Sequence, residues 1–176
     1  ETFTGFQYSL YNLDLSGKQN GAVSLQDLRQ MRNLRHLSIS QMPQATLSAD
    51  DFREFGIDVK ELSIIQSNLN TIKSHTFTHL RGIKYLDFSE NAISSIEDEA
   101  FSEVGHSLIT LKFAHGLSLS EIPAKAFQPL TNLQYLDMSN NKLRSMPENS
   151  FHFLKRIKRI EMQDNEISDV KKGTFQ

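Results

Sequence analysis

Residues 133–143, LQYLDMSNNKL, place leucine at the first, fourth and eleventh positions and asparagine at the ninth. Residues 83–93, IKYLDFSENAI, follow the same arrangement. Apolar side chains at alternate positions, such as Leu136 and Met138, are typical of a short strand that turns one face inward. An asparagine just beyond that strand can satisfy backbone groups where the chain turns away. Both stretches therefore predict a strand followed by an asparagine-supported turn.

This pattern repeats along essentially the whole chain. Seven units begin at residues 10, 34, 59, 83, 108, 133 and 157. A later apolar pair closes most units, at Leu28/Met31, Phe52/Phe55, Phe77/Leu80, Phe101/Val104, Phe127/Leu130 and Phe151/Leu154. A regular period within the range of about 20 to 29 residues is typical of a solenoid, in which each unit stacks on the next. We expect residues 1–176 to form a single solenoid segment, cut within a repeat at both ends.

The repeat predicts an α/β-type solenoid shaped as a horseshoe. Short parallel strands should line its concave side, with loops and 3-10 turns on the convex side. One ring per unit should stack into a phenylalanine spine beneath the convex side, at Phe77, Phe101, Phe127 and Phe151.

A structural ladder of asparagines is expected eight residues into the units. Its members are Asn91, Asn141 and Asn165. Ser67 offers a hydroxyl at the same place, whereas the remaining units have Lys18, Met42 and Gly116 there. We expect irregular turns where the asparagine is missing.

Composition excludes several classes of function. The chain has 19 basic and 21 acidic side chains, a net charge of -2 and no cysteine. This balance gives no reason to expect nucleic acid or an anionic membrane as a partner. Disulfides and thiolate metal sites are excluded. No stretch approaches the roughly 18 apolar residues of a membrane span, and no Asn-x-Ser/Thr glycosylation sequence is present.

The two quoted stretches, together with the recurring phenylalanines, resemble the "typical" 24-residue leucine-rich repeat of extracellular proteins. That class includes Toll-like receptor ectodomains, Slit-like guidance proteins and insect photoreceptor adhesion proteins. Residues 101–108 and 115–117 look similar to repeats of the last group. The resemblance implies a cell-surface location and a membrane anchor outside this chain. Cytosolic leucine-rich proteins of the ribonuclease-inhibitor type, which have longer and more helical units, are the alternative.

The residues between the inward leucines should form a continuous surface on the concave side. They fall into two columns: Asn12, His36, Glu61, Tyr85, Thr110, Tyr135 and Arg159, then Asp14, Ser38, Ser63, Asp87, Lys112, Asp137 and Glu161. We expect a binding patch formed by Tyr85, Asp87, Lys112, Tyr135, Asp137, Arg159 and Glu161, because tyrosine and arginine are enriched at protein interfaces. The same residues would also suit an ordinary solvated strand face.

One concentrated basic run, residues 155–159, could meet an acidic partner. It could equally be a solvated edge balanced by Glu161 and Asp164. No aromatic side chains lie between its charges as a single-stranded nucleic-acid platform would require.

The sequence offers no catalytic arrangement. His75 and His79 are spaced as on one helical face, but the glutamate of a zinc-protease motif does not follow His75. The carboxylates do not predict a sheltered acid–base pair, and the glycines do not form a phosphate-binding loop. We therefore expect neither an enzyme nor a bound metal or cofactor.

The leading hypothesis from the resemblance is a protein-recognition module of an extracellular adhesion protein. Its partner would be another protein, including the homophilic case of the same protein on an apposed membrane. The alternative is a ligand-binding segment of a Toll-like or other leucine-rich-repeat signalling receptor. Neither hypothesis involves nucleic acid or a small-molecule substrate.

Overall fold

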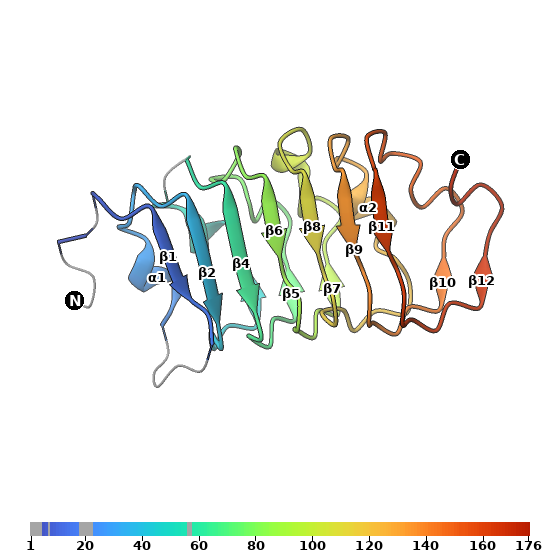
Figure 1. Cartoon of the computed structure of the whole chain (residues 1–176), viewed down its shortest axis with the longest axis horizontal. Coiled ribbons are helices and arrows are strands. Elements are labelled where there is room, and N and C mark those ends of the chain that lie inside the picture. Colours follow the sequence, from blue (N-terminus) through green and yellow to red (C-terminus); the bar gives the residue numbers. More distant parts are fainter. Residues whose placement is uncertain (1–4, 7, 18–22, 56–57) are drawn as a thin grey trace.

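The computed structural model describes residues 5, 6, 8–17, 23–55 and 58–176. Within them, one parallel sheet of seven strands runs along most of the molecule (Figure 1). Its seven strands, in spatial order, are β1 (Asn12–Leu15), β2 (His36–Ser40), β4 (Glu61–Ile65), β6 (Tyr85–Asp87), β8 (Thr110–Lys112), β9 (Tyr135–Asp137) and β11 (Arg159–Glu161). Each strand pairs with the strand of the next unit, so the sheet order follows the chain order. We call its outer surface the sheet face.

Short elements cover the opposite side of the sheet. The strands there are β3 (Thr46–Leu47), β5 (Thr71–Ile72) and β7 (Ser95–Ile96) in one group, and β10 (Ser145–Met146) and β12 (Asp169–Val170) in another. The helical turns are α1 (Leu25–Leu28), η1 (Ala49–Phe52), η2 (Ser102–Val104) and α2 (Ala124–Phe127). This arrangement confirms the predicted leucine-rich-repeat solenoid of parallel strands with a loop and 3-10 side.

A continuous apolar core lies between the two sides. The inward strand residues Leu62, Leu86, Leu111 and Leu136 are at most 1% exposed. Fully burying a leucine stabilises the fold by about 1.5–3 kcal/mol. Since every coil contributes several such residues, stacking the coils supplies most of the stability.

The predicted phenylalanine spine is present and is wider than the pattern indicates. Phe77 and Phe101 stack with ring centroids 5.6 Å apart and an interplanar angle of 6°. Phe88 and Phe113, which follow strands β6 and β8, join the spine from the sheet side at 6.0 Å from Phe77 and 6.3 Å from Phe127, respectively. Phe151 stacks instead on Phe175, at 5.5 Å.

Amide side chains bridge successive coils at the asparagine positions. The Asn91 Oδ1 accepts from the backbone N–H groups of Ser67 and Leu69, and its Nδ2 donates to the Ile64 and Phe88 carbonyls. Asn141 and Asn165 make the same kind of bridge. In the third coil, which has Ser67 in place of asparagine, the Ser67 Oγ accepts from the Met42 N–H and donates to the Ile65 carbonyl. Lys18 lies outside the described residues.

A left-handed residue precedes each of these ladder positions from the second unit onward. The residues are Gln41, Gln66, Glu90, His115, Asn140 and Asp164, with φ between 46° and 57°. Such φ values are uncommon for residues other than glycine, asparagine, aspartate and histidine. The sequence pattern did not reveal this turn, because three of the six, Gln41, Gln66 and Glu90, are not residues that favour it.

Gly116 occupies the ladder position of the fifth unit for a steric reason. A Cβ atom there would lie 2.6 Å from the Phe88 carbonyl oxygen. The Gly116 N–H donates to the Phe113 carbonyl, and the Gly116 carbonyl accepts from the Ile93 N–H. The Gly116 carbonyl therefore supplies one of the contacts to the preceding coil that an asparagine side chain supplies in other coils.

Replacing Gly116 by asparagine, the residue that the repeat pattern favours, should destabilise the protein. The added Cβ would push against backbone, which costs about 1–3 kcal/mol in a packed site. Urea unfolding should show a lower midpoint for Gly116→Asn than for the unmodified protein. A raised midpoint would mean that the asparagine ladder can be completed in this coil.

Candidate functional site

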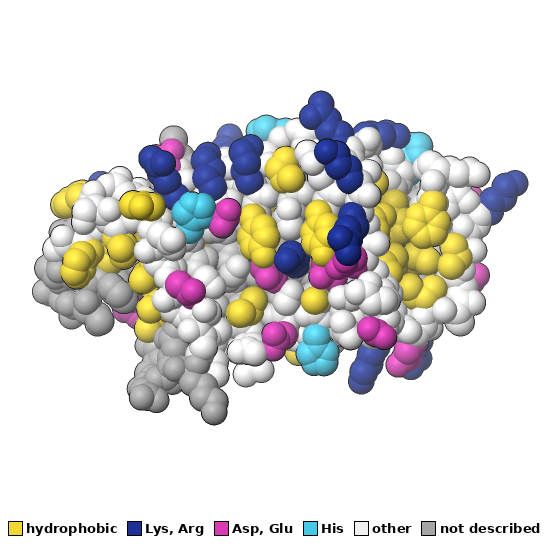
Figure 2. Space-filling view, viewed as in Figure 1, with side chains coloured by type: hydrophobic (Ala, Val, Ile, Leu, Met, Phe, Trp, Pro, Cys, Tyr) yellow, Lys and Arg dark blue, Asp and Glu magenta, His cyan; other side chains and the backbone are white. Residues whose placement is uncertain are grey.

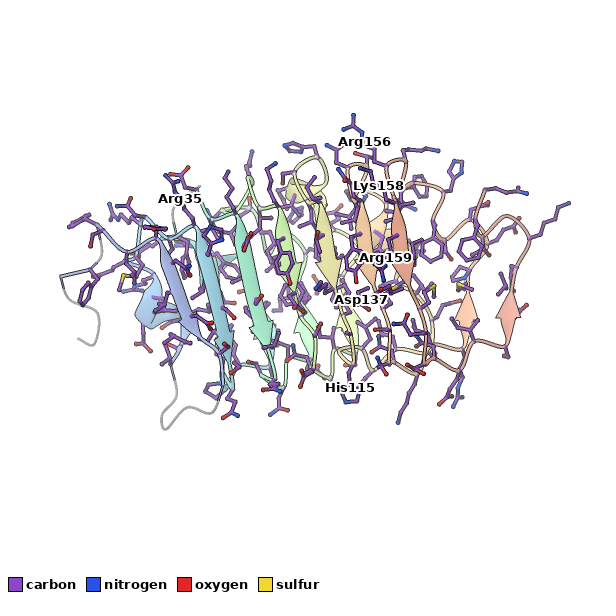
Figure 3. All side chains as sticks on the ribbon, viewed as in Figure 1. Arg35, His115, Asp137, Arg156, Lys158 and Arg159 are labelled. Atoms are coloured by element: carbon purple, nitrogen blue, oxygen red, sulfur yellow. The ribbon has the colours of Figure 1, made fainter. Side chains whose placement is uncertain are left out.

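The expected binding residues lie side by side in the carboxyl-terminal half of the sheet face. Strand pairing aligns Tyr85, Thr110, Tyr135 and Arg159 in one row and Asp87, Lys112, Asp137 and Glu161 in the next. Figure 3 shows Asp137 and Arg159 on the face of the sheet, between its two edges. We call these residues, apart from Thr110, the sheet-face patch.

Lys112 lies between two tyrosine rings. Its Nζ is 5.6 Å from the centroid of the Tyr85 ring and 5.6 Å from that of the Tyr135 ring. A cation within about 6 Å of an aromatic face is attracted by the negative charge density of the ring. The alternation of ring, ammonium and ring spans three neighbouring strands.

The stack continues to Arg159 in the next strand. The Arg159 guanidinium lies 5.8 Å from the centroid of the Tyr135 ring and also pairs with Glu161. The Tyr135 hydroxyl donates to the Glu161 carboxylate at 2.5 Å. Five side chains from four strands are therefore held in one arrangement before any partner arrives.

Proton affinities reflect this arrangement. Burial, followed by the neighbouring carboxylates, raises the pKa of Tyr85 to about 12. Burial and the hydrogen bond to Glu161 raise the pKa of Tyr135 to about 12. The Tyr135 hydrogen bond and the positive charge of Arg159 lower the pKa of Glu161. At neutral pH the patch therefore presents the neutral phenols of Tyr85 and Tyr135 beside the ionised carboxylate of Glu161.

Two of the expected contact residues shape the turn that follows the strand. The Asp87 carboxylate accepts from the Ser89 N–H at 2.9 Å, and the Asp137 carboxylate accepts from both the N–H and the hydroxyl of Ser139. Asp137 is only 8% exposed. Side chains of aspartate commonly stabilise turns in this way. Asp137 is therefore a nearly buried member of the patch that stabilises the turn. The tyrosines and cations form the part of the patch that faces solvent.

The amino-terminal half of the sheet face has smaller and more polar side chains. Its clearest contact joins His36 Nδ1 to a Glu61 carboxylate oxygen at 2.9 Å. Ser38 and Ser63 lie beside this pair in the second row. Among the described residues, this half of the sheet face has no aromatic stack comparable to that of the patch.

Of the two histidines at four-residue spacing, His75 and His79, only His75 pairs with carboxylates within the described residues. His75 lies between two glutamates, with Nε2 2.8 Å from Glu99 and Nδ1 2.6 Å from Glu103. The carboxylates occupy opposite nitrogens of the ring, so they do not converge on one point. Within the described residues, no group of three or more histidine, aspartate or glutamate side chains is arranged to hold a metal ion.

None of the described helices is long and apolar enough to cross a bilayer.

The His75 cluster gives a pH prediction. The hydrogen bond and charge of Glu103, with the smaller influence of Glu99, raise the pKa of His75. A raised folded-state pKa adds stability that is fully present below the unfolded-state pKa of about 6.5 and disappears as pH rises through the folded value. The difference in urea midpoint between the unmodified protein and His75→Asn should therefore be larger at a pH of about 5.5 than at about 8.5.

His79→Asn serves as the matched control for this titration, since His79 forms no ion pair within the described chain. Asparagine is chosen because it tolerates the positive φ that His75 adopts. A midpoint difference for His75→Asn that does not change with pH would contradict the role of the glutamates.

The basic run at residues 155–159 is divided by the strand geometry. Arg159 lies on the sheet face and pairs with Glu161. Arg156 and Lys158 lie above it at the edge where the strands begin (Figure 3). Arg159 therefore belongs to the patch, and the other cations belong to a separate surface.

Comparison with known proteins adds the family. Residues 47–176 match the description "BspA type Leucine rich repeat region" in six copies. Chaoptin of Drosophila melanogaster is 51% identical over 179 residues, which cover 100% of this chain and 14% of that protein. Chaoptin of Tribolium castaneum is 48% identical over 80 residues, covering 44% of this chain and 10% of that protein. The chain thus spans a small part of the length of these relatives.

The fold is also found in a solved receptor structure. Toll, in the structure of the Toll–Spatzle complex of Drosophila, superposes with a TM-score of 0.74 at 20% sequence identity, over 84% of this chain and 19% of that chain. At this identity the likeness concerns the fold alone. Chaoptin and Toll are cell-surface proteins. The match to chaoptin over all of this chain and the six copies of the family repeat show that the chain belongs to the leucine-rich-repeat family, as a homologue of chaoptin.

Proposed function

We propose that this chain is a protein-recognition segment of an extracellular adhesion protein and that the sheet-face patch is its contact surface. The observation that carries the proposal is the stack of Tyr85, Lys112, Tyr135 and Arg159 across adjacent strands. Tyrosine and arginine dominate the energetically important contacts of protein interfaces. In line with the resemblance to chaoptin, we infer a homophilic contact with a second copy on an apposed membrane. The proposal involves no catalytic step.

Preorganisation favours binding at this place. Ordering a flexible side chain at an interface costs about 0.5–1.5 kcal/mol. Tyr135 is already held by Glu161, and Lys112 is already held between two rings. The patch can therefore receive a partner with little further loss of side-chain freedom.

Self-association measured by sedimentation over a wide concentration range tests the proposal. The paired substitution Lys112→Ala and Arg159→Ala should weaken self-association by about 30-fold, since interface hot spots contribute about 2 kcal/mol or more. Lys73→Ala with Arg53→Ala makes the same charge change on the opposite side of the solenoid and should leave self-association unchanged. Equal loss in both variants would contradict a specific patch.

The alternative is a ligand-binding segment of a signalling receptor. It is favoured by the fold shared with Toll, whose solved structure is a complex with Spatzle. In that case the protein would remain monomeric alone at every concentration and would pair only when a distinct protein ligand is bound. A strictly monomeric protein would therefore overturn the homophilic form and favour the receptor form.

A further inference from the structure

A row of cations lies along the edge where the parallel strands begin. Six turns enter the sheet strands β2, β4, β6, β8, β9 and β11. In that order they consist of residues 32–35, 58–60, 81–84, 106–109, 131–134 and 155–158. Their charged residues are eight cations, Arg32, Arg35, Lys60, Arg81, Lys84, Lys155, Arg156 and Lys158, and one acid, Asp58. Figure 2 shows Lys and Arg side chains along this upper edge, and Figure 3 places Arg35, Arg156 and Lys158 there. We call the eight cations the basic edge.

The charges of the basic edge are not compensated locally. Within the described chain, no carboxylate lies within ion-pairing distance of any of the eight. Among the described cations outside the edge, Arg29, Arg53, Lys125, Arg144 and Arg159 pair with a carboxylate, whereas Lys73, Lys112, Lys142, Lys171 and Lys172 do not. Two of the eight cations donate to carbonyl oxygens, Arg81 to that of Thr78 and Lys60 to that of Gly82. These turns therefore carry eight cations and one acid in a chain of net charge -2, in two groups separated by the turns that enter β8 and β9, which contain no lysine or arginine.

The basic edge is linear. Strands of a sheet lie about 4.8 Å apart, so Arg35, Lys60 and Lys84 follow one another at that interval over β2, β4 and β6. Lys158 lies three strands further along the same edge. A ligand that contacts both groups must be extended and must carry negative charge at many points.

The residue types at the basic edge favour one class of polyanionic ligand over the others. The six turns contain no phenylalanine, tyrosine or tryptophan. Protein interfaces use aromatic anchors, and single-stranded nucleic acids require stacking rings. Arginine binds oxyanions through two parallel hydrogen bonds, and lysine contributes a point charge. These features fit a flexible chain of oxyanions without apolar parts.

We propose that the basic edge binds a linear sulfated polysaccharide. Because the family relatives are cell-surface proteins, a sulfated glycan is the linear oxyanion chain that such a protein meets. This ligand uses a surface distinct from the sheet-face patch, so both can be occupied together. The inference shares with the proposed function only the cell-surface location.

Affinity for an immobilised heparin dodecasaccharide tests this inference. The triple substitution Arg35→Gln, Lys60→Gln and Lys84→Gln should weaken binding about tenfold or more and make its salt dependence less steep. The matched control is Lys73→Gln, Lys142→Gln and Lys171→Gln, which removes three cations from outside the edge. Binding of the control should change less than about twofold, as expected for charges beyond contact with the ligand.

Either of two results would overturn the inference. The first is equal weakening in both triple variants, which would show attraction by overall charge. The second is equal or tighter binding to polyglutamate or to vesicles of anionic lipid, which would assign the edge to an acidic protein or a membrane. Self-association of the edge variant should be unchanged, so this test and the test of the patch fail independently.

Discussion

Gly105→Ala should be among the most destabilising single substitutions in this protein. A Cβ atom at Gly105 would lie 2.1 Å from the Pro129 carbonyl oxygen and 2.7 Å from the carbonyl carbon of the same residue. These are backbone atoms of the next coil, so the clash cannot be relieved by turning a side chain. Overpacking usually costs about 1–3 kcal/mol, and we expect about 3 kcal/mol or more here because two coils must separate.

Urea unfolding of Gly105→Ala should therefore show a much lower midpoint. His106 is the adjacent residue and is exposed. His106→Ala should move the free energy of unfolding by no more than about 0.5 kcal/mol, as is usual for surface substitutions. A Gly105→Ala protein with the stability of the unmodified one would show that the coils are not packed as closely as described.

Asn141→Ala should destabilise the protein by about 3 kcal/mol, since it removes four hydrogen bonds and leaves a buried donor unpaired. The Asn141 Oδ1 accepts from the N–H groups of Gly116 and Leu117, and its Nδ2 donates to the Phe113 and Met138 carbonyls. After the substitution, the four backbone groups differ in whether another hydrogen-bond partner is available to them.

Alternative partners remain for three of these groups. The Gly116 N–H also donates to the Phe113 carbonyl, and the Met138 carbonyl also accepts from Asn165. The Leu117 N–H makes its hydrogen bond to Asn141 alone within the described chain. The cost of Asn141→Ala therefore comes chiefly from the orphaned Leu117 N–H.

Thermal and urea unfolding can separate this effect from a general sensitivity of the turn. Lys142 is the next residue, and its side chain is exposed. Lys142→Ala should therefore change the free energy of unfolding by no more than about 0.5 kcal/mol. Asn141→Asp should also destabilise, because a carboxylate cannot donate to the two carbonyls. Similar stability for Asn141→Ala and Lys142→Ala would contradict the ladder.

The strands and the core were predictable because each depends on periodicity. Alternating apolar positions such as Leu86 and Phe88 set the inward side of a strand, and the regular period of the repeats sets the stacking of coils. The asparagine positions were predictable for the same reason. The two columns on the sheet face also follow from register alone.

Close contacts between coils were not predictable from the pattern. Gly105 has an ordinary φ of -57°, and its need for a missing Cβ arises only from the approach of Pro129. Phe88 and Phe113 belong to strands by their spacing, yet their rings extend the spine because the return segment passes beside them. These features depend on distances between segments that the sequence does not encode locally.

The register of the patch residues on the sheet was predictable, whereas the arrangement of their side chains was not. Register placed Lys112 beside Asp87 and Asp137, which would suggest an ion pair. The structure instead directs its ammonium group between the rings of Tyr85 and Tyr135. Asp137 is occupied by Ser139 of its own turn. Side-chain rotamers and turn contacts decide this outcome.

The most direct test of the sheet-face patch is an amide chemical-shift map of isotope-labelled protein at rising concentrations of unlabelled protein. The proposal predicts that the largest shifts fall on residues 85–87, 110–112, 135–137 and 159–161, on four neighbouring strands of one face. Shifts confined to the opposite side of the solenoid or to the basic edge would contradict it, as would a spectrum that does not change at any concentration.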